Sequence, residues 1–321
     1  MCDCINLDWS GGADFDMGWL TAADMQERRL CIDVPGQRTA LPSSLGFLEM
    51  FEVGNVAQLN IAARWAKADA SRTLQAPVGV DAQGEPAVLN LHERAHGPHG
   101  LIAGTTGSGK SEFIITYVLS LAVCYPPDQV AFVLIDHKGG GLAGAFDNDR
   151  FRLPHLAGTI TNLDGAAISR SLVSIKSELK RRQAVLAAAR EKTGEATMDI
   201  YKYISYYLRG ALTEPLPHLF LIADEFAELK DQQPEFMDEL MSAALASSTM
   251  RDCGLPFISA HVSVASEPIT ITGSPFFNDW QMFSDRFRYA FTVIHVVGRS
   301  FHCCVRLSKY RLVLAILNEL A

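Results

Sequence analysis

A glycine-rich run between a short apolar stretch and a helical stretch constrains this chain more than any other feature. Residues 100–103 form the apolar stretch, and the helical pattern covers 111–124 before Pro126-Pro127 ends it. The run between them has the spacing GxxxxGKS, with the residues Gly104, Thr105, Thr106, Gly107, Ser108, Gly109, Lys110 and Ser111. This spacing, placed between a strand and a helix, is typical of a phosphate-binding P-loop.

Each residue type in the run has a physical reason. The glycines let the backbone approach the phosphates, and successive N–H groups then converge on them at the N-terminal end of the following helix. Lys110 supplies a positive charge for the β- and γ-phosphates, and the Ser111 hydroxyl is a ligand for Mg²⁺. The sequence therefore predicts a site at Gly104–Ser111 for ATP, or a close relative of it, together with Mg²⁺.

A second acidic motif completes the expected site. The apolar run 219–223 ends in Asp224-Glu225, at the edge where open α/β sheets bind their ligands. Asp224 is placed to hold Mg²⁺ through water, and Glu225 is the candidate general base for an attacking water. Acidic residues also favour helix N-termini for electrostatic reasons alone. Together with the upstream loop, however, the pair favours hydrolysis over binding alone, with Glu225 and Lys110 as the catalytic residues.

Another strand ends in an acidic residue whose role stays open. The continuous apolar run 130–135 is typical of a strand that is buried on both faces, and it ends at Asp136. His137-Lys138 and three glycines follow. Asp136 and its neighbours could contact phosphate, a neighbouring subunit or a substrate, or they could simply form the turn at the end of the strand.

The remaining pattern predicts an α/β fold. Strands that alternate with helices of this length indicate a mostly parallel sheet with right-handed crossovers. A small hairpin precedes it, with strands at 78–80 and 86–91, and the N-terminal segment contains short helices at 45–53 and 57–66. Further helices are expected at 164–190, with Asp164 as the N-cap, at 198–208 and at 226–246. The charged stretch 176–183 is interpreted as a solvated helix face.

Composition narrows the class of protein. A chain of 321 residues that is 48% hydrophobic can bury the core of one large α/β domain, alone or with a smaller lobe. Its net charge of −8 gives no general attraction for nucleic acid. The sequence shows neither a leader peptide nor an apolar run of about 18 residues. Its seven cysteines form no CxxC pair, so reduced thiols and a cytoplasmic location are expected.

One motif points elsewhere. Residues 92–96 read HERAH, which fits the zinc-protease pattern HExxH. That chemistry needs both histidines on one face of a helix. An apparent strand precedes the motif and Gly97-Pro98 follows it, so no helix fits. The segment is interpreted as the lead into the strand before the P-loop.

The motifs together resemble a known family. The run HGPHGLIAGTTGSGKSE at 96–112 is similar to the P-loop region of the FtsK/SpoIIIE ATPases, and most of all to the EssC/EccC branch of type VII secretion. Three further runs agree with that branch: FVLIDHKGGG at 132–141, LPHLAGTITNLD at 153–164 and ELKRRQ at 178–183. The resemblance covers residues 40–246.

This resemblance carries expectations about fold, partners and location. It implies a RecA-like P-loop NTPase fold, Mg-ATP hydrolysis, and work in a ring or chain of modules, either a homo-oligomer or neighbouring ATPase modules. It also implies secretion-machinery partners and small helical secreted proteins as cargo, whereas DNA translocation belongs to the sister branch. Full-length members carry transmembrane helices. A single module is therefore expected at the inner face of the membrane, held there by partners or by a membrane-anchored part.

The pattern of the family fails after residue 246. Members continue with an arginine-rich helix end and a strand that ends in Ala-Thr-Gln, and both are missing here. Residues 255–261 could replace that strand, with His261 near the sensor position, although Pro256 is unfavourable inside a central strand. A later strand is expected at 289–297. We divide the chain into an N-terminal segment at 1–70, an ATPase core at 71–246 and a divergent tail at 247–321.

Two explanations of the tail stay open. A frameshifted, non-native reading would pack poorly after residue 246, whereas true divergence would give a degenerate, regulatory module. The missing motifs make nucleotide binding a safer expectation than efficient turnover. The leading hypothesis is thus an ATPase motor of type VII secretion. The alternatives are a nucleotide-binding assembly or regulatory module with little turnover, and a DNA-translocating motor.

Overall fold

A computed structural model gives the fold. It describes residues 45–80, 84–104, 109–136, 141–148, 151–161, 165–224, 257–262 and 291–296, and all structural statements below concern these residues. Asp164, Glu225 and the helix expected at 226–246 lie outside them.

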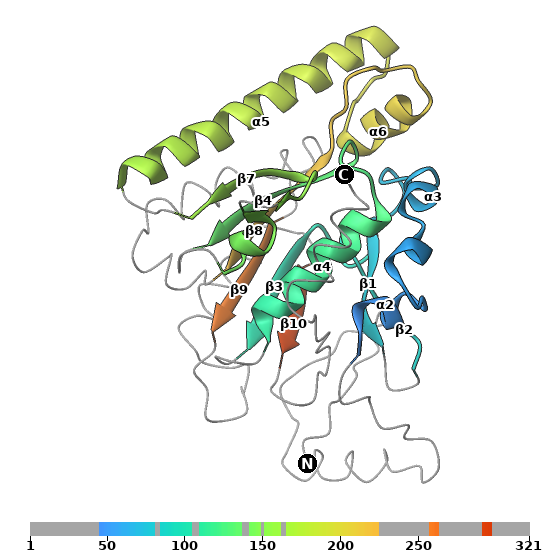
Figure 1. The fold of residues 1–321 in the computed structure, drawn as a ribbon. Helices are drawn as coiled ribbons and strands as arrows, with labels where there is room; N and C mark the ends of the chain where they lie inside the picture. The colour runs from blue at the N-terminus through green and yellow to red at the C-terminus, as the bar shows by residue number, and fades with distance from the viewer. Residues whose placement is uncertain are drawn as a thin grey trace, which may run out of the picture.

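A six-stranded sheet forms the centre of the molecule (Figure 1). Every pair of neighbouring strands in it is parallel, as the sequence predicts. The strands follow the order β10-β3-β9-β8-β4-β7. Their bounds in that order are Phe291–Val296, His99–Gly104, Phe257–Val262, His218–Asp224, Val130–Asp136 and Leu156–Ile160.

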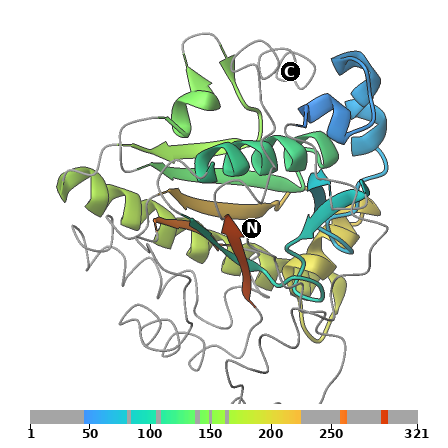
Figure 2. The same ribbon diagram turned by 90° about the horizontal axis from the view of Figure 1, so that it is seen from below.

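Helices cover both faces of this sheet. Helix α4 (Lys110–Cys124) connects β3 to β4, and helix α5 (Gly165–Thr193) leads from β7 back toward β8. The chain moves along the sheet in opposite directions through these two connections, so right-handed crossovers place the helices on opposite faces. Figure 2 shows this arrangement of α4, the sheet and α5. Helix α6 (Ile200–Leu208) follows α5.

Smaller elements surround the sheet. The predicted hairpin is present as β1 (Gln75–Val80) paired antiparallel with β2 (Pro86–Asn90). The predicted short helices are also present, as α2 (Phe47–Met50), the 3₁₀ helix η1 (Val56–Leu59) and α3 (Ile61–Trp65). A 3₁₀ turn and two antiparallel strands of two residues each lie between β4 and β7. They are η2 (Ala143–Ala145), β5 (Asp147–Asn148) and β6 (Phe151–Arg152).

Two strands of the sheet come from the described residues after position 246. β9 lies in the interior of the sheet, between β3 and β8, and β10 pairs with β3 over six residues. Pro256 does not interrupt β9, because the strand begins at Phe257. The strand expected at 289–297 is confirmed as β10.

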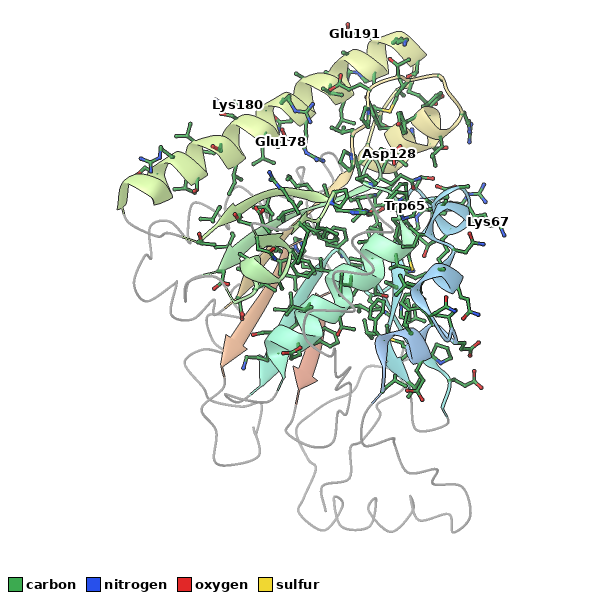
Figure 3. The ribbon with its side chains drawn as sticks, in the orientation of Figure 1. Trp65, Lys67, Asp128, Glu178, Lys180 and Glu191 are labelled. Carbon is green, nitrogen blue, oxygen red and sulfur yellow. The ribbon has the colours of Figure 1, made fainter. Side chains whose placement is uncertain are left out.

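One residue in the charged stretch contradicts the expectation of a solvated helix face. Arg182 on α5 is only 1% exposed. Its Nε donates to Glu178 Oε1 at 2.8 Å and its Nη1 donates to the Pro217 carbonyl at 2.8 Å. Lys180, by contrast, is exposed, and Figure 3 shows Glu178 and Lys180 on opposite sides of α5. Composition alone does not reveal which position in a charged run faces the sheet.

The segment before β1 is joined to the sheet by a cluster of buried hydrogen bonds. Gln129, which is 2% exposed, donates from Nε2 to the Ala68 carbonyl at 3.2 Å and accepts the Ala70 N–H at 2.9 Å. His218 Nε2 lies 3.1 Å from the Ala70 carbonyl and donates to it. The Trp65 indole donates to the Ala122 carbonyl at 2.9 Å, which ties α3 to α4 (Figure 3).

We expect Gln129→Leu to destabilise the fold by about 2–6 kcal/mol. The replacement removes two buried hydrogen bonds and leaves the Ala68 carbonyl and the Ala70 N–H without their partner, at about 1–3 kcal/mol for each unsatisfied group. Urea unfolding followed by circular dichroism measures the change. Gln183→Leu on the exposed side of α5 is the control and should change stability by less than about 0.5 kcal/mol. Equal effects of the two replacements would show that the Gln129 contacts contribute nothing.

Three buried histidines should make the fold sensitive to acid. Burial lowers the pKa of His99 and His155 to about 4 and that of His218 to about 3. These imidazoles are neutral in the folded protein, whereas in the unfolded chain they take up protons below a pH of about 6.5. Their contribution to stability is therefore complete above that pH. It is lost progressively as the pH falls from about 6.5 toward 4.

The free energy of unfolding should fall by about 1.4 kcal/mol per pH unit for each histidine, or roughly 4 kcal/mol per pH unit for the three together. Urea unfolding between pH 7 and pH 5 measures it. In His155→Gln the slope should fall by about 1.4 kcal/mol per pH unit, because one site of proton uptake is gone. A slope that His155→Gln leaves unchanged would contradict the assignment of His155 as a neutral, buried group.

Candidate functional site

The first half of the candidate site lies where β3 meets α4. Gly104 is the last residue of β3, and Lys110 is the first residue of α4. Gly109 precedes the helix with a φ of +98°, a left-handed conformation that disfavours any residue with a Cβ atom. Lys110 is 7% exposed. The remaining loop residues, Thr105, Thr106, Gly107 and Ser108, lie outside the described residues.

Helix α4 makes this end of the sheet favourable for an anion. The helix has 15 residues, and Phe113 and most of the residues after it are buried. Its N-terminal N–H groups and its dipole point toward the loop. A fixed helix N-terminus beside the cationic Lys110 is suited to bind phosphate.

The second half of the site lies at the end of β8. All seven residues of this strand are buried, and the last of them is Asp224, which is 8% exposed. The Ser111 hydroxyl donates to Asp224 Oδ2 at 3.0 Å and so joins residues that are 113 positions apart. The end of the P-loop and the end of β8 therefore meet, although β9 lies between β3 and β8 in the sheet.

The oxygens of Ser111 and Asp224 suit a magnesium ion. Mg²⁺ prefers hard oxygen ligands and usually keeps several waters, with one or two carboxylates and phosphate oxygens completing its shell. A hydroxyl and a carboxylate at hydrogen-bond distance, next to an anion-binding helix end, fit that preference. Glu225, the candidate base, follows Asp224 directly in the sequence and lies outside the described residues.

Asp136 lies beside Asp224 but has other partners. The two residues are opposite each other in the β4–β8 pairing. Asp136 Oδ2 accepts the backbone N–H groups of Leu142 at 2.8 Å and Ala143 at 3.3 Å. Of the roles left open by the sequence, these bonds favour the turn at the end of the strand. The sequence signal for this role is an aspartate before a glycine-rich loop that returns to apolar residues.

The HExxH motif does not lie on a helix. Residues 92–96 form turns, as the flanking residues predict. His92 Nδ1 accepts the Arg94 N–H at 3.1 Å, and His96 Nδ1 accepts the Asn90 N–H at 3.0 Å. Within the described part of the chain, no group of three or more His, Cys, Asp or Glu side chains could hold a metal ion together.

Comparison with known proteins identifies the family. Residues 59–265 match the FtsK/SpoIIIE family. The chain belongs to this family. The match confirms the resemblance noted in the sequence and the RecA-like fold class. Nucleotide binding is a property of the family, generally with Mg²⁺.

The relatives belong to the EssC/EccC branch. The type VII secretion system protein EssC of Staphylococcus aureus strain Mu50 is 50% identical over 220 residues, which are 68% of this chain and 14% of EssC. The ESX secretion system protein EccC of Geobacillus thermodenitrificans strain NG80-2 is 48% identical over 211 residues, which are 65% of this chain and 14% of EccC. The chain thus spans about one seventh of the length of these curated relatives.

A solved structure of an EccC protein is also similar to this chain. The cytoplasmic domain of the Thermomonospora curvata type VII secretion ATPase EccC matches with a TM-score of 0.58 and 32% sequence identity. The match covers 69% of this chain and 25% of that one. Among the helices that the structure describes here, none combines the length and the hydropathy needed to span a lipid bilayer.

Proposed function

We propose that this chain is an ATP-binding motor module of a type VII secretion system, which hydrolyses Mg-ATP to drive protein export. The observation that carries the proposal is the hydrogen bond from Ser111 to Asp224. It brings the end of the P-loop and the end of the second acidic strand to one point at the carboxyl edge of the sheet, where open α/β folds bind nucleotides. The 50% identity to EssC supports the same assignment.

Each residue of the site has a distinct role in the proposal. Residues Gly104–Gly109 hold the phosphates with backbone N–H groups, and Lys110 places its charge on them. Ser111 and Asp224 hold the magnesium ion, directly and through water. When bound, that ion neutralises the charge on the phosphates. Glu225 accepts the proton of the attacking water.

The proposed partners and location follow from the relatives. EssC and EccC are secretion-system proteins, so this module acts with other subunits of such a machine and with neighbouring ATPase modules or further copies of itself. Small helical secreted proteins are the cargo. The site of action is the cytoplasmic face of the membrane, reached through partners or a membrane-anchored part. The net charge of −8 disfavours a DNA-translocating role.

One observation favours a second function, that of a nucleotide-binding regulatory module with little turnover. β9 lies between β3 and β8, and its residues His261 and Val262 pair with Ala103 and Gly104 beside the P-loop. In the family, a strand with the ending Ala-Thr-Gln is expected at this place. A histidine in place of the sensor glutamine is consistent with slow hydrolysis after intact binding.

The proposed site predicts a defined loss of affinity in Lys110→Ala. The replacement removes a charge-assisted contact to phosphate, which contributes about 1.5–3 kcal/mol, so the affinity for Mg-ATP should fall by roughly 10–100-fold. Fluorescence titration with a labelled ATP analogue measures it. Lys180→Ala, on the exposed side of α5, is the matched control and should bind like the wild type. Unchanged affinity in Lys110→Ala would refute the assignment of the site.

A further inference from the structure

Two acidic residues end neighbouring strands of the sheet and face different partners. Asp136 ends β4 and Asp224 ends β8, and the two are opposite each other in the parallel pairing. Both are nearly buried, at 4% and 8% exposure. Asp224 accepts a hydrogen bond from Ser111 at the end of the P-loop. Asp136 instead accepts hydrogen bonds from the backbone of the connection that follows its own strand.

The bonds of Asp136 hold Leu142 and Ala143 beside the end of β4. Five residues, 137–141, separate Asp136 from Leu142, whose N–H it accepts at 2.8 Å. Leu142 and Ala143 are 2% and 4% exposed, so their N–H groups have little access to water as an alternative partner. Phe146, at the end of the η2 turn, is fully buried. The carboxylate thus fixes Leu142 and the start of η2 beside the end of β4.

We infer that Asp136 is a positioning residue for the nucleotide site and not a ligand of the magnesium ion. Its Oδ2 is occupied by two backbone N–H groups, whereas Asp224 faces the Ser111 hydroxyl. By accepting the N–H groups of Leu142 and Ala143, Asp136 holds the end of β4 in place beside the end of β8. Asp224 therefore keeps its place beside Ser111. This inference rests on the proposed function, because it assigns a role within the same site.

The charge and the acceptor oxygen of Asp136 can be separated by substitution. Asp136→Asn removes the charge but keeps a carbonyl oxygen that can accept the same two N–H groups. Asp136→Leu keeps the branched shape of the side chain, with two larger methyl groups in place of the oxygens, and removes the acceptor. Asp224→Asn is the matched control, because the same change there removes the charge next to Ser111. A positioning role needs only the acceptor, whereas a metal ligand also needs the charge.

The test is the affinity for ADP, measured by fluorescence titration with Mg²⁺ and again with EDTA, on the full chain. We expect Asp136→Asn to stay within about threefold of the wild type under both conditions. Asp136→Leu should lose about tenfold in affinity with Mg²⁺, comparable to one lost hydrogen bond. In Asp224→Asn, Mg²⁺ should no longer raise the affinity for ADP.

Two results would overturn the inference. One is an Asp136→Asn variant that loses the gain from Mg²⁺ as Asp224→Asn does, since that would make Asp136 a metal ligand. The other is a folded Asp136→Leu variant that binds Mg-ADP like the wild type. If Asp136→Leu does not fold, Asp136→Asn alone still shows whether Asp136 binds the metal ion or only accepts the backbone N–H groups. A wild-type chain with no affinity for ADP would instead refute the proposed function, and the inference with it.

Discussion

Glu225→Gln should lower ATP turnover by at least about 100-fold and leave nucleotide affinity within about threefold of the wild type. An amide has nearly the shape of a carboxylate but does not accept the proton of the attacking water, and general base catalysis contributes about 10²–10⁴ in rate. Glu225 follows the last residue of β8, at the edge of the sheet that carries Ser111 and Asp224. Phosphate release at saturating Mg-ATP measures turnover.

The control for this variant is Glu191→Gln, which removes an exposed carboxylate on α5 (Figure 3). It should turn over ATP like the wild type. Equal, near-zero turnover in the wild type and in Glu225→Gln, with nucleotide bound in both, would contradict the motor function. That result would support the regulatory module instead.

Arg182→Ala should destabilise the fold by about 2–4 kcal/mol, because a hydrogen bond to a charged group contributes about 1.5–3 kcal/mol and the Pro217 carbonyl loses its donor. The guanidinium is 1% exposed and bonds both Glu178 and the Pro217 carbonyl. Its removal leaves the Pro217 carbonyl without this donor and opens space between α5 and the start of β8. A loss of this size is a large fraction of the stability of a typical domain.

Arg181→Ala is the matched control for Arg182→Ala. Arg181 also pairs with Glu178, and in addition with Glu214, but its side chain is 45% exposed. Exposed ion pairs contribute about 0–1 kcal/mol, so the loss should stay within that range. Urea unfolding of both variants gives the comparison. Losses of equal size in the two variants would show that burial of Arg182 has no energetic consequence.

Local patterns in the sequence predict much of the fold, because the elements concerned are defined by neighbouring residues. The strand, glycine loop and helix around Gly104 follow from spacing and hydropathy alone. The apolar strand that ends at Asp224 is equally local. A parallel sheet joins the carboxyl ends of such strands at one edge, so the meeting of Ser111 with Asp224 agrees with what these local patterns predict.

Long-range pairing is harder to read from the sequence. β9 begins directly after Pro256 and takes an interior place in the sheet, yet its composition gives little sign of that place. Its position is set by the backbone pairing with β3 and β8, which no local pattern encodes. The sequence predicts β10 as a strand but does not predict its pairing with β3.

Buried polar residues are the second feature that local patterns miss. Arg182 lies within a run that reads as a solvated face, and its bond to the Pro217 carbonyl joins residues 35 positions apart, which no local pattern shows. Gln129 likewise bonds a loop 59 to 61 positions earlier in the chain. The sequence leaves the role of Asp136 open because the bonds that decide it come from residues beyond the glycines.

In the proposed function, the P-loop and Asp224 together build a single Mg-nucleotide site. The most direct measurement is calorimetric titration of the wild-type chain with ADP, once with Mg²⁺ and once with EDTA. We predict one nucleotide bound per chain, with an affinity that Mg²⁺ strengthens by about tenfold or more, as a metal ion bridging protein oxygens and phosphate should do. No binding at millimolar ADP, or binding that Mg²⁺ does not affect, would contradict the claim.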